Sequence, residues 1–425
     1  MNGSNNEIIS ATFRQGEPSS KIALQIGAAT LCRLFLNTSR RFVYPFAPAL
    51  SRGLGVSLPA ITSIIAANQI TGIMGPFFGP LGDRWGYRIM LLIGMALLAA
   101  GMLAGAFLPF YAMIMLGLFL AGLGKNIFDP AIQAYVGSRV DYRRRAFVIG
   151  LMETAWAGSS LIGIPLAGLL IQNLGWRSPF FVFGFIGVFG VISLSILLPK
   201  NKAAVATIPL KPLGIISSWL HLAHNRSALG LLCFAFFASA ANDNCFVVYG
   251  AWFEDSFHLS IVTLGITTVV IGIAELLGEI LTAALADRIG LRRSIMIGLV
   301  LSGLSYALLP ILQSNVVMAM TGMFFVFLTF EFTIVAAISL GTEILPASRA
   351  TMMSGFFAAA GIGRVVGALL GGPLWLAGGM WVTGTTSALF SVFALVSLLW
   401  GFHGKKSSLL KFTDQNHSKI SSNMF

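Results

Sequence analysis

Long apolar runs, separated by short polar or charged stretches, repeat along almost the whole chain. Runs of about 18 residues or more are typical of membrane-spanning helices, whereas the core helices of soluble proteins have shorter ones. The pattern predicts twelve spans, at residues 22–50, 58–79, 89–108, 110–136, 147–172, 179–198, 228–253, 261–284, 294–313, 315–342, 351–376 and 380–402. We therefore predict an all-α polytopic membrane protein, with polar tails at 1–21 and 403–425.

Composition supports this prediction. Of 425 residues, 56% are hydrophobic and only 10% are charged. The net charge of +12 would suggest a nucleic-acid partner in a soluble protein, but membrane proteins concentrate Lys and Arg in cytoplasmic loops, so we expect none here. Cys32, Cys233 and Cys245 fall inside apolar runs and are interpreted as buried hydrophobes without disulfides. Histidine spacing suggests no metal site, and no phosphate-binding glycine loop is present, so we expect neither enzymatic activity nor a cofactor.

The loop charges predict an orientation. Twenty cations lie in the tails and in the loops on the same side of the predicted membrane, from Arg14 to Lys419. The opposite set of loops contains only Arg52 and Arg177. Because Lys and Arg accumulate in cytoplasmic loops, both termini are predicted to lie in the cytoplasm, as in an inner-membrane protein.

Several residues recur at one fixed offset. Asp83 and Asp287 lie 204 positions apart, and so do Arg145 and Arg349. Unrelated matches would scatter over many offsets, so the chain is predicted to consist of two six-helix halves, 22–198 and 228–402. Residues 199–227 then form a cytoplasmic linker between them.

The loop between the second and third spans carries a characteristic motif, with a second copy further on. The first copy contains Gly79, Gly82, Asp83, Arg84, Gly86 and Arg88. The second contains Asp287, Arg288, Gly290 and Arg292, with Ala283 in the place of Gly79. Glycines allow tight turns, and the charges could pair across the halves as a conformational latch or simply anchor the loops in water.

With this motif and twelve spans, the chain resembles transporters of the major facilitator superfamily over about residues 22–402. The resemblance implies two six-helix bundles that alternate access to a site near the bilayer midplane. Helix 5 carries Gly163, Pro165 and Gly168, which is similar to the motif of drug-exporting antiporters except that Ile164 separates Gly from Pro. A kinked packing surface of small residues is the other interpretation of this stretch.

Eleven charged residues lie within the predicted spans. They are Arg33, Arg40, Arg41, Lys125, Asp129, Glu153, Asp243, Glu275, Glu279, Glu331 and Arg364. Each costs about 2.5–3.5 kcal/mol at the centre of a membrane helix, so these residues must face partners or a wet cavity. Either they neutralise one another between helices, or they form a transport site.

Spacing places several of these groups together. Arg33, Asn37, Arg40 and Tyr44 form one stripe on helix 1. Lys125 and Asp129 are spaced to pair within helix 4. In helix 7, Asn242, Asp243 and Asn244 occur at mid-depth, and Asn244 corresponds to Arg40 under the repeat.

From these residues we predict a proton-coupled secondary transporter of a small organic solute. Arginine suits carboxylate or phosphate, so an anionic or zwitterionic substrate is expected. The predicted substrate-binding residues are Arg33, Asn37, Arg40, Tyr44, Lys125, Asn242, Asn244 and Arg364. Burial favours the protonated form of a carboxylate, so the predicted proton-coupling residues are Asp243, Glu331, Asp129 and Glu153. Glu275 and Glu279 are expected nearer the cytoplasm, beside the Asp287 loop.

Two alternatives remain open at this stage. One is a multidrug or sugar efflux antiporter. The other is a transporter-like receptor or lipid scramblase without coupled transport. The expected partners are a small-molecule substrate, protons and the lipid bilayer, and we expect a monomer.

Overall fold

The computed structural model describes residues 19–74, 78, 85–140, 148, 151–152, 154–199, 222–345 and 349–403. Every regular element within these ranges is helical. The first half contains α2 (Ser19–Arg41), α3 (Ala47–Leu54), α4 (Leu58–Ile73), α6 (Tyr87–Phe107), α7 (Tyr111–Arg139), the π-helix η1 (Ser159–Gly163), α9 (Ile164–Leu174) and α10 (Ser178–Leu197). The second contains α12 (Arg226–Phe246), α13 (Tyr249–Phe257), α14 (Ile261–Ile289), α15 (Leu291–Leu308), the short 3-10 helix η2 (Leu312–Ser314), α16 (Val316–Ile344) and α17 (Arg349–Phe402).

Nine helical ranges of the described chain are long and apolar enough to cross a membrane, or ten if the bent pair α3 and α4 counts as one. Twelve are reached only if the bent pair counts as one span, α2 is added, and the two arms of α17 are counted separately, so that number stays a prediction. Helix α17 is interrupted at Gly378 and Gly379, where the backbone leaves the helical region. This break lies between the predicted spans 351–376 and 380–402. Gly379 has φ 57°, a conformation that favours glycine.

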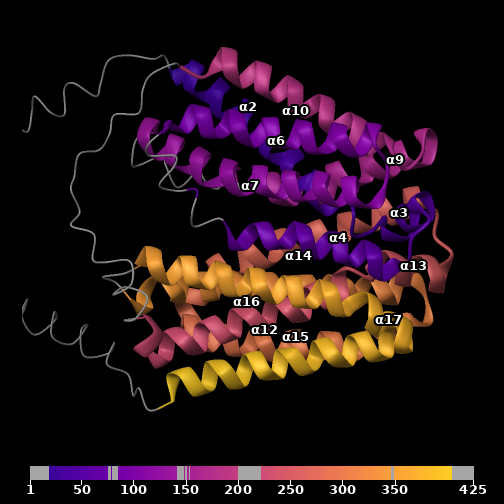
Figure 1. Cartoon of the computed structure of the whole chain (residues 1–425). Coiled ribbons are helices and arrows are strands. Elements are labelled where there is room, and N and C mark those ends of the chain that lie inside the picture. The colour runs from indigo at the N-terminus through magenta and orange to yellow at the C-terminus, as the bar shows by residue number, and fades with distance from the viewer. Residues whose placement is uncertain are drawn as a thin grey trace, which may run out of the picture.

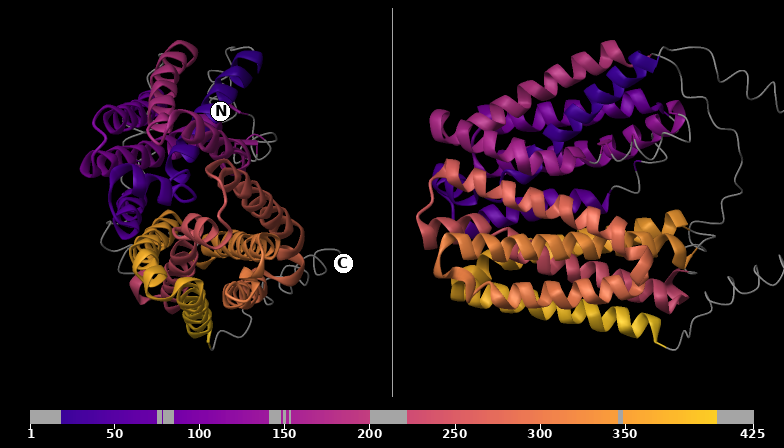
Figure 2. Two further views of the ribbon diagram at one scale, coloured as in Figure 1. Left: turned by 90° about the vertical axis from the view of Figure 1, so that its right-hand side faces the viewer. Right: turned by 180° about the vertical axis from the view of Figure 1, so that it is seen from behind.

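The helices before residue 199 lie on one side of the molecule and those after residue 222 on the other (Figures 1 and 2). The start of α2 and the end of α17 lie at the same end of the molecule, which we call the terminal end (Figure 1). The opposite end, which carries α3 and α13, we call the far end (Figure 1). An even number of crossings would produce this arrangement.

Small residues let the two sides approach closely. A Cβ at Gly168 of α9 would lie 3.2 Å from the Ile261 carbonyl oxygen, and one at Gly250 of α13 would lie 2.0 Å from the Pro45 carbonyl oxygen. Backbone groups of opposite halves therefore meet at positions where a larger side chain would not fit. The glycine-rich stretch of helix 5 thus forms a packing surface toward α14.

The outer surface of the helices is apolar. Ile196 is 75% exposed, and Phe189 and Val317 are also among the most exposed large apolar residues. Exposed apolar surface on this scale does not suit water but does suit lipid. The chain is therefore an integral multi-pass membrane protein.

Candidate functional site

The side chains of the predicted stripe on helix 1, and Arg41 beside it, differ in which half of the molecule they contact. Arg33 and Arg40 interact inside the first half, whereas Arg41 and Tyr44 bind residues of the second half. Asn37 is fully buried, and neither of its side-chain polar atoms has a hydrogen-bond partner within the described residues. The halves are thus connected by the last residue of α2 and by Tyr44 just after it.

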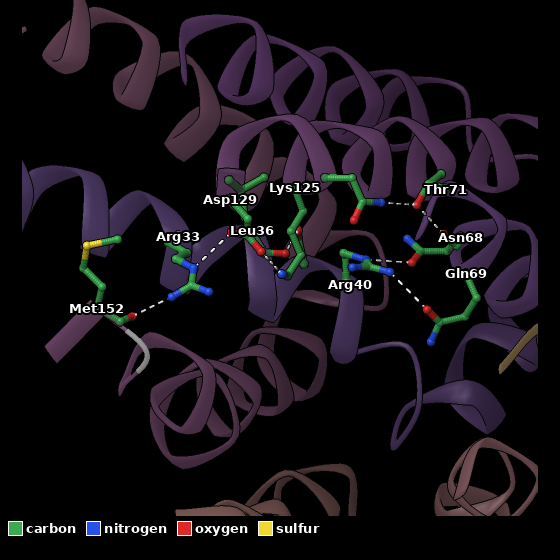
Figure 3. A network of polar contacts seen from close by, with 11 residues as sticks. Arg33, Leu36, Arg40, Asn68, Gln69, Thr71, Lys125, Asp129 and Met152 are labelled. Atoms are coloured by element: carbon green, nitrogen blue, oxygen red, sulfur yellow. Dashed lines mark hydrogen bonds and ion pairs between the residues drawn. The ribbon is translucent and has the colours of Figure 1, made fainter. Parts of the chain in front are cut away.

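The first group of charges lies between α2 and α7. Arg33 Nε donates a hydrogen bond to Asp129 Oδ1 at 3.0 Å, and Lys125 Nζ binds the other carboxylate oxygen (Figure 3). Arg33 also donates to the Met152 carbonyl oxygen at 2.9 Å. The predicted pairing of Lys125 with Asp129 is confirmed. One carboxylate thus contacts two cations, one from each helix.

Arg40 is held by neutral side chains of α4. Its Nε donates to Asn68 Oδ1 at 2.8 Å, and one terminal nitrogen donates to Gln69 Oε1 at 3.1 Å (Figure 3). Asn68 is itself fixed by a hydrogen bond to the Leu118 carbonyl oxygen. Amides orient a guanidinium without neutralising its charge.

Asp243 of α12 connects the two halves. Tyr44 donates to Asp243 Oδ1 at 2.9 Å, and Gln69 Nε2 donates to the same oxygen at 3.2 Å. Arg364 of α17 approaches the other oxygen at 3.8 Å. Gln69 therefore accepts from Arg40 and donates to Asp243, which links the two charges through one amide.

A buried ion pair between α2 and α14 lies outside the predicted set of site residues. Arg41 donates to Glu275 Oε1 at 2.6 Å, and the two residues are only 5% and 2% exposed. Ser160 of the π-helix η1 donates to Glu275 Oε2 at 3.3 Å, and Arg41 lies over the Trp156 ring at 4.3 Å. The expectation that Glu275 works with the Asp287 loop is wrong, because its carboxylate faces Arg41 of the other half.

Glu331 of α16 lies partly buried, with no hydrogen bond or ion pair to any residue that the structure describes. Its electrostatic neighbours are Glu275, Glu279, Arg364 and Arg41. A Cβ at Gly278 of α14 would lie 2.8 Å from the Glu331 Cβ, so α14 and α16 are in close contact there. Glu275 and Glu279 of α14 therefore lie near Glu331 of α16 in the second half.

Other predicted residues lie away from these groups. Asn244 is fully buried and donates to the Thr383 carbonyl oxygen and to Ser387 Oγ, within the second half. Asn242 accepts a hydrogen bond from Tyr306. Both residues fix α12 to its neighbours. Glu153 lies outside the described residues.

The structure describes some of the residues of the predicted conformational latch. Gly86 and Gly290, equivalent under the repeat, have φ values of 89° and 91°. Each precedes a helix in a conformation that side chains rarely adopt, which explains why both copies contain glycine. Arg88 donates to the Ser195 carbonyl oxygen at 2.6 Å, Arg288 is exposed and Arg292 lies over the Phe402 ring at 5.3 Å. Gly79, Asp83, Arg84 and the side chain of Asp287 lie outside the described part of the chain.

The sequence reasoning missed Asn68, Gln69 and Trp156. Asn68 and Gln69 form a polar pair in the apolar run 58–79, and this signal could have identified them. No sequence pattern around Trp156 distinguishes it, since aromatic residues are common in these helices.

Comparisons with known proteins agree with this arrangement. The sequence profile of the Major Facilitator Superfamily matches residues 29–252 and 232–420. The chain is 25% identical over 362 residues to the uncharacterized MFS-type transporter YceJ of Bacillus subtilis (strain 168), covering 84% of this chain and 90% of the relative. It is 24% identical over 397 residues to the multi-drug resistance efflux pump PmrA homolog of Lactococcus lactis subsp. lactis (strain IL1403), covering 89% and 94%.

A solved structure of a bacterial homolog of the human lysosomal transporter Spinster, inward-facing and unoccupied, has the same fold. The TM-score is 0.72 at 14% identity, covering 91% of this chain and 97% of that one. The profile match spans most of the chain, and the fold agrees with it. This chain therefore belongs to the major facilitator superfamily of membrane transporters.

Proposed function

We propose that the protein is a proton-coupled secondary transporter of a small anionic or zwitterionic organic solute, with both termini in the cytoplasm. The observation that carries the proposal is Arg40, a membrane-depth guanidinium held by the amides of Asn68 and Gln69. None of the residues that the structure describes supplies Arg40 with a carboxylate within 4 Å, and such a charge is costly in a bilayer unless a ligand or water compensates it.

The distribution of charge supports an anionic group on the substrate. Arg33 and Lys125 lie beside Asp129 on the first half, and Arg40, which amides hold, adds a cation on the same half. Glu331 lies on the other half, where its electrostatic neighbours are Glu275, Glu279, Arg364 and Arg41. A solute with a carboxylate would bind on the first half, and an added ammonium group would suit the second.

The contacts between the halves support alternating access with the far end closed. Tyr44 and Gln69 bind Asp243, Arg41 binds Glu275, and Thr268 donates to the Ser160 carbonyl oxygen at 3.0 Å. Arg52 of α3 pairs with Glu254 of α13 at the rim. Asp243 lies near the end of α12 and Thr268 near the start of α14, both toward the far end, whereas Glu275 lies at the middle of α14. These contacts must separate when access changes sides.

Efflux of lipophilic drugs is a second candidate, because one relative is a multi-drug resistance efflux pump homolog. The two candidates differ in substrate charge. Uptake into proteoliposomes with an imposed pH gradient, screened with organic acids, amino acids, sugars and cationic dyes, separates them. Gradient-driven movement of dyes alone would overturn the anion proposal.

Replacing Arg40 with alanine should lower transport of an anionic substrate by about tenfold to a hundredfold, the range expected for a lost charge-assisted hydrogen bond. Proteoliposome uptake measures the loss, and size-exclusion chromatography checks that the variant is folded. Arg293→Ala is the matched control, since Arg293 is an exposed residue at the start of α15 and should leave uptake unchanged. Normal uptake by Arg40→Ala would remove Arg40 from the site.

Replacing Glu331 with glutamine should abolish gradient-driven accumulation while substrate exchange continues. The amide keeps the shape of the side chain but cannot bind and release a proton. Counterflow and pH-driven uptake measured on the same vesicles separate the two activities. Glu343→Gln is the control, because Glu343 lies on the same helix α16 but is exposed. Accumulation at the original level in Glu331→Gln would exclude Glu331 as the proton carrier.

A further inference from the structure

An apolar pocket opens on the outside of the first half, away from the charged groups of the transport site. It has a volume of about 390 Å³ and lies between α2, α9 and α10. Its lining includes Phe35, Leu166, Leu170, Val182, Phe183 and Ile186. Leu166 and Leu169 are 49% and 44% exposed on its edge, so the pocket faces the surroundings of the helices.

Both helices that flank the pocket are candidate membrane spans, so its surroundings are hydrocarbon. A hollow in a lipid-facing surface must be filled by something apolar and flexible, because an unfilled hollow loses van der Waals contacts. A lipid acyl chain has this chemistry. The transported solute proposed above, which carries charge, does not.

A cation, Arg177, follows one end of the pocket in the chain. Asn173 and Leu174 line the pocket at the end of α9, and the chain then turns at Gly175 to reach Arg177 and the start of α10. Arg177 is exposed, and its guanidinium lies 5.4 Å from the Trp176 ring. The start of α10 adds the partial positive charge of a helix N-terminus next to Arg177. Trp and Arg at the end of a span are typical of the level of the lipid headgroups.

We propose that this pocket is a binding site for one phospholipid, with an acyl chain between α9 and α10 and the headgroup phosphate at Arg177. The lining agrees with this assignment, since it is almost entirely apolar and includes Leu174, three residues before Arg177 in the chain. The floor of the pocket is formed by Phe35 of α2 and by Gly163, where a Cβ would lie 2.0 Å from Thr38 Oγ1. A bound chain would therefore support the packing of helix 5 against α2, next to the turns that carry Arg33 and Arg41.

The test uses the full chain in vesicles of phosphatidylethanolamine and phosphatidylglycerol that contain a trace of phosphatidylglycerol with a diazirine in its acyl chain. After irradiation, labelled residues are identified by mass spectrometry. We expect labelling to concentrate on α9 and α10 around the pocket. Val182→Trp, which fills the pocket, should lower that labelling by about tenfold. Val188→Trp is the matched control, because Val188 is on the same helix, is 38% exposed and does not line the pocket.

The headgroup contact is tested separately. Arg177→Gln should lower labelling by the phosphatidylglycerol probe, and Arg177→Lys should retain it. A diacylglycerol probe without phosphate should respond to neither change. If Val182→Trp does not fold, Leu170→Trp takes its place. Labelling spread evenly over the lipid-facing residues, or an equal change in Val182→Trp and Val188→Trp, would overturn the proposal. Labelling does not depend on transport, so a failure here leaves the proposed function unaffected.

Discussion

Replacing Asp129 with alanine is expected to destabilise the protein by about 3–5 kcal/mol, the cost of leaving a buried charge without its partner. Asp129 compensates both Arg33 and Lys125, which are 4% and 8% exposed. Without the carboxylate, two cations would lie together inside the first half. Reversible unfolding in mixed detergent micelles measures the loss.

A second variant separates charge from packing. Lys125→Met should cost less than Asp129→Ala, because the Arg33–Asp129 pair remains at 3.0 Å. The double variant Lys125→Met/Asp129→Ala should recover part of the stability, since one of the two cations that contact Asp129 is then removed with it. If Asp129→Ala unfolds at the same denaturant concentration as the parent protein, the group is not a source of stability.

Replacing Glu275 with alanine is expected to open the far end of the molecule. Arg41 would lose its only carboxylate contact described within 4 Å, and a buried guanidinium without a partner favours a state in which water reaches it. The loss of this contact between α2 and α14 removes a restraint that holds the two halves together. The expected change of about 3–5 kcal/mol is large enough to reverse a conformational equilibrium.

The reactivity of a cysteine at Thr268 measures this opening. Thr268 is 1% exposed and donates to the Ser160 carbonyl oxygen across the interface. In a chain whose native cysteines are replaced by alanine, Thr268→Cys should react faster with a water-soluble maleimide when Glu275→Ala is also present. The control is Glu254→Ala, because the Arg52–Glu254 pair is more exposed and such pairs contribute about 0–1 kcal/mol. Equal rates in the two variants would show that the Arg41–Glu275 pair does not hold the far end closed.

The fold was largely predictable from the sequence, for a physical reason. A bilayer requires long apolar helices, so the spans are visible in the spacing of charges. The start of α10, predicted at 179, lies at Ser178, and α14 begins at Ile261 as predicted. The largest difference is helix 1, which divides into α2 and α3 around Pro45. The repeat also predicted an equivalent backbone at Gly86 and Gly290, and both have positive φ.

The candidate site was predictable only in its residue types. Arg33, Arg40 and Arg41 were all expected to need partners, but the sequence did not indicate which residues those partners are. The one pair that it predicted lies within a single helix. Lys125 and Asp129 are four residues apart, so helical geometry alone brings them together. Arg41 and Glu275 are 234 residues apart, and no local pattern indicates that they meet.

The sequence by itself determined that this is a membrane protein of repeated helices, and that several charges lie at depths where lipid excludes them. These properties follow from composition and spacing, which do not depend on how the helices pack. Only the tertiary structure decided which acid faces which base, that Arg40 is held by amides, and that Asn244 points into its own half. The reason is that the rotation of each helix about its axis and its choice of neighbours result from the packing of side chains distant in sequence.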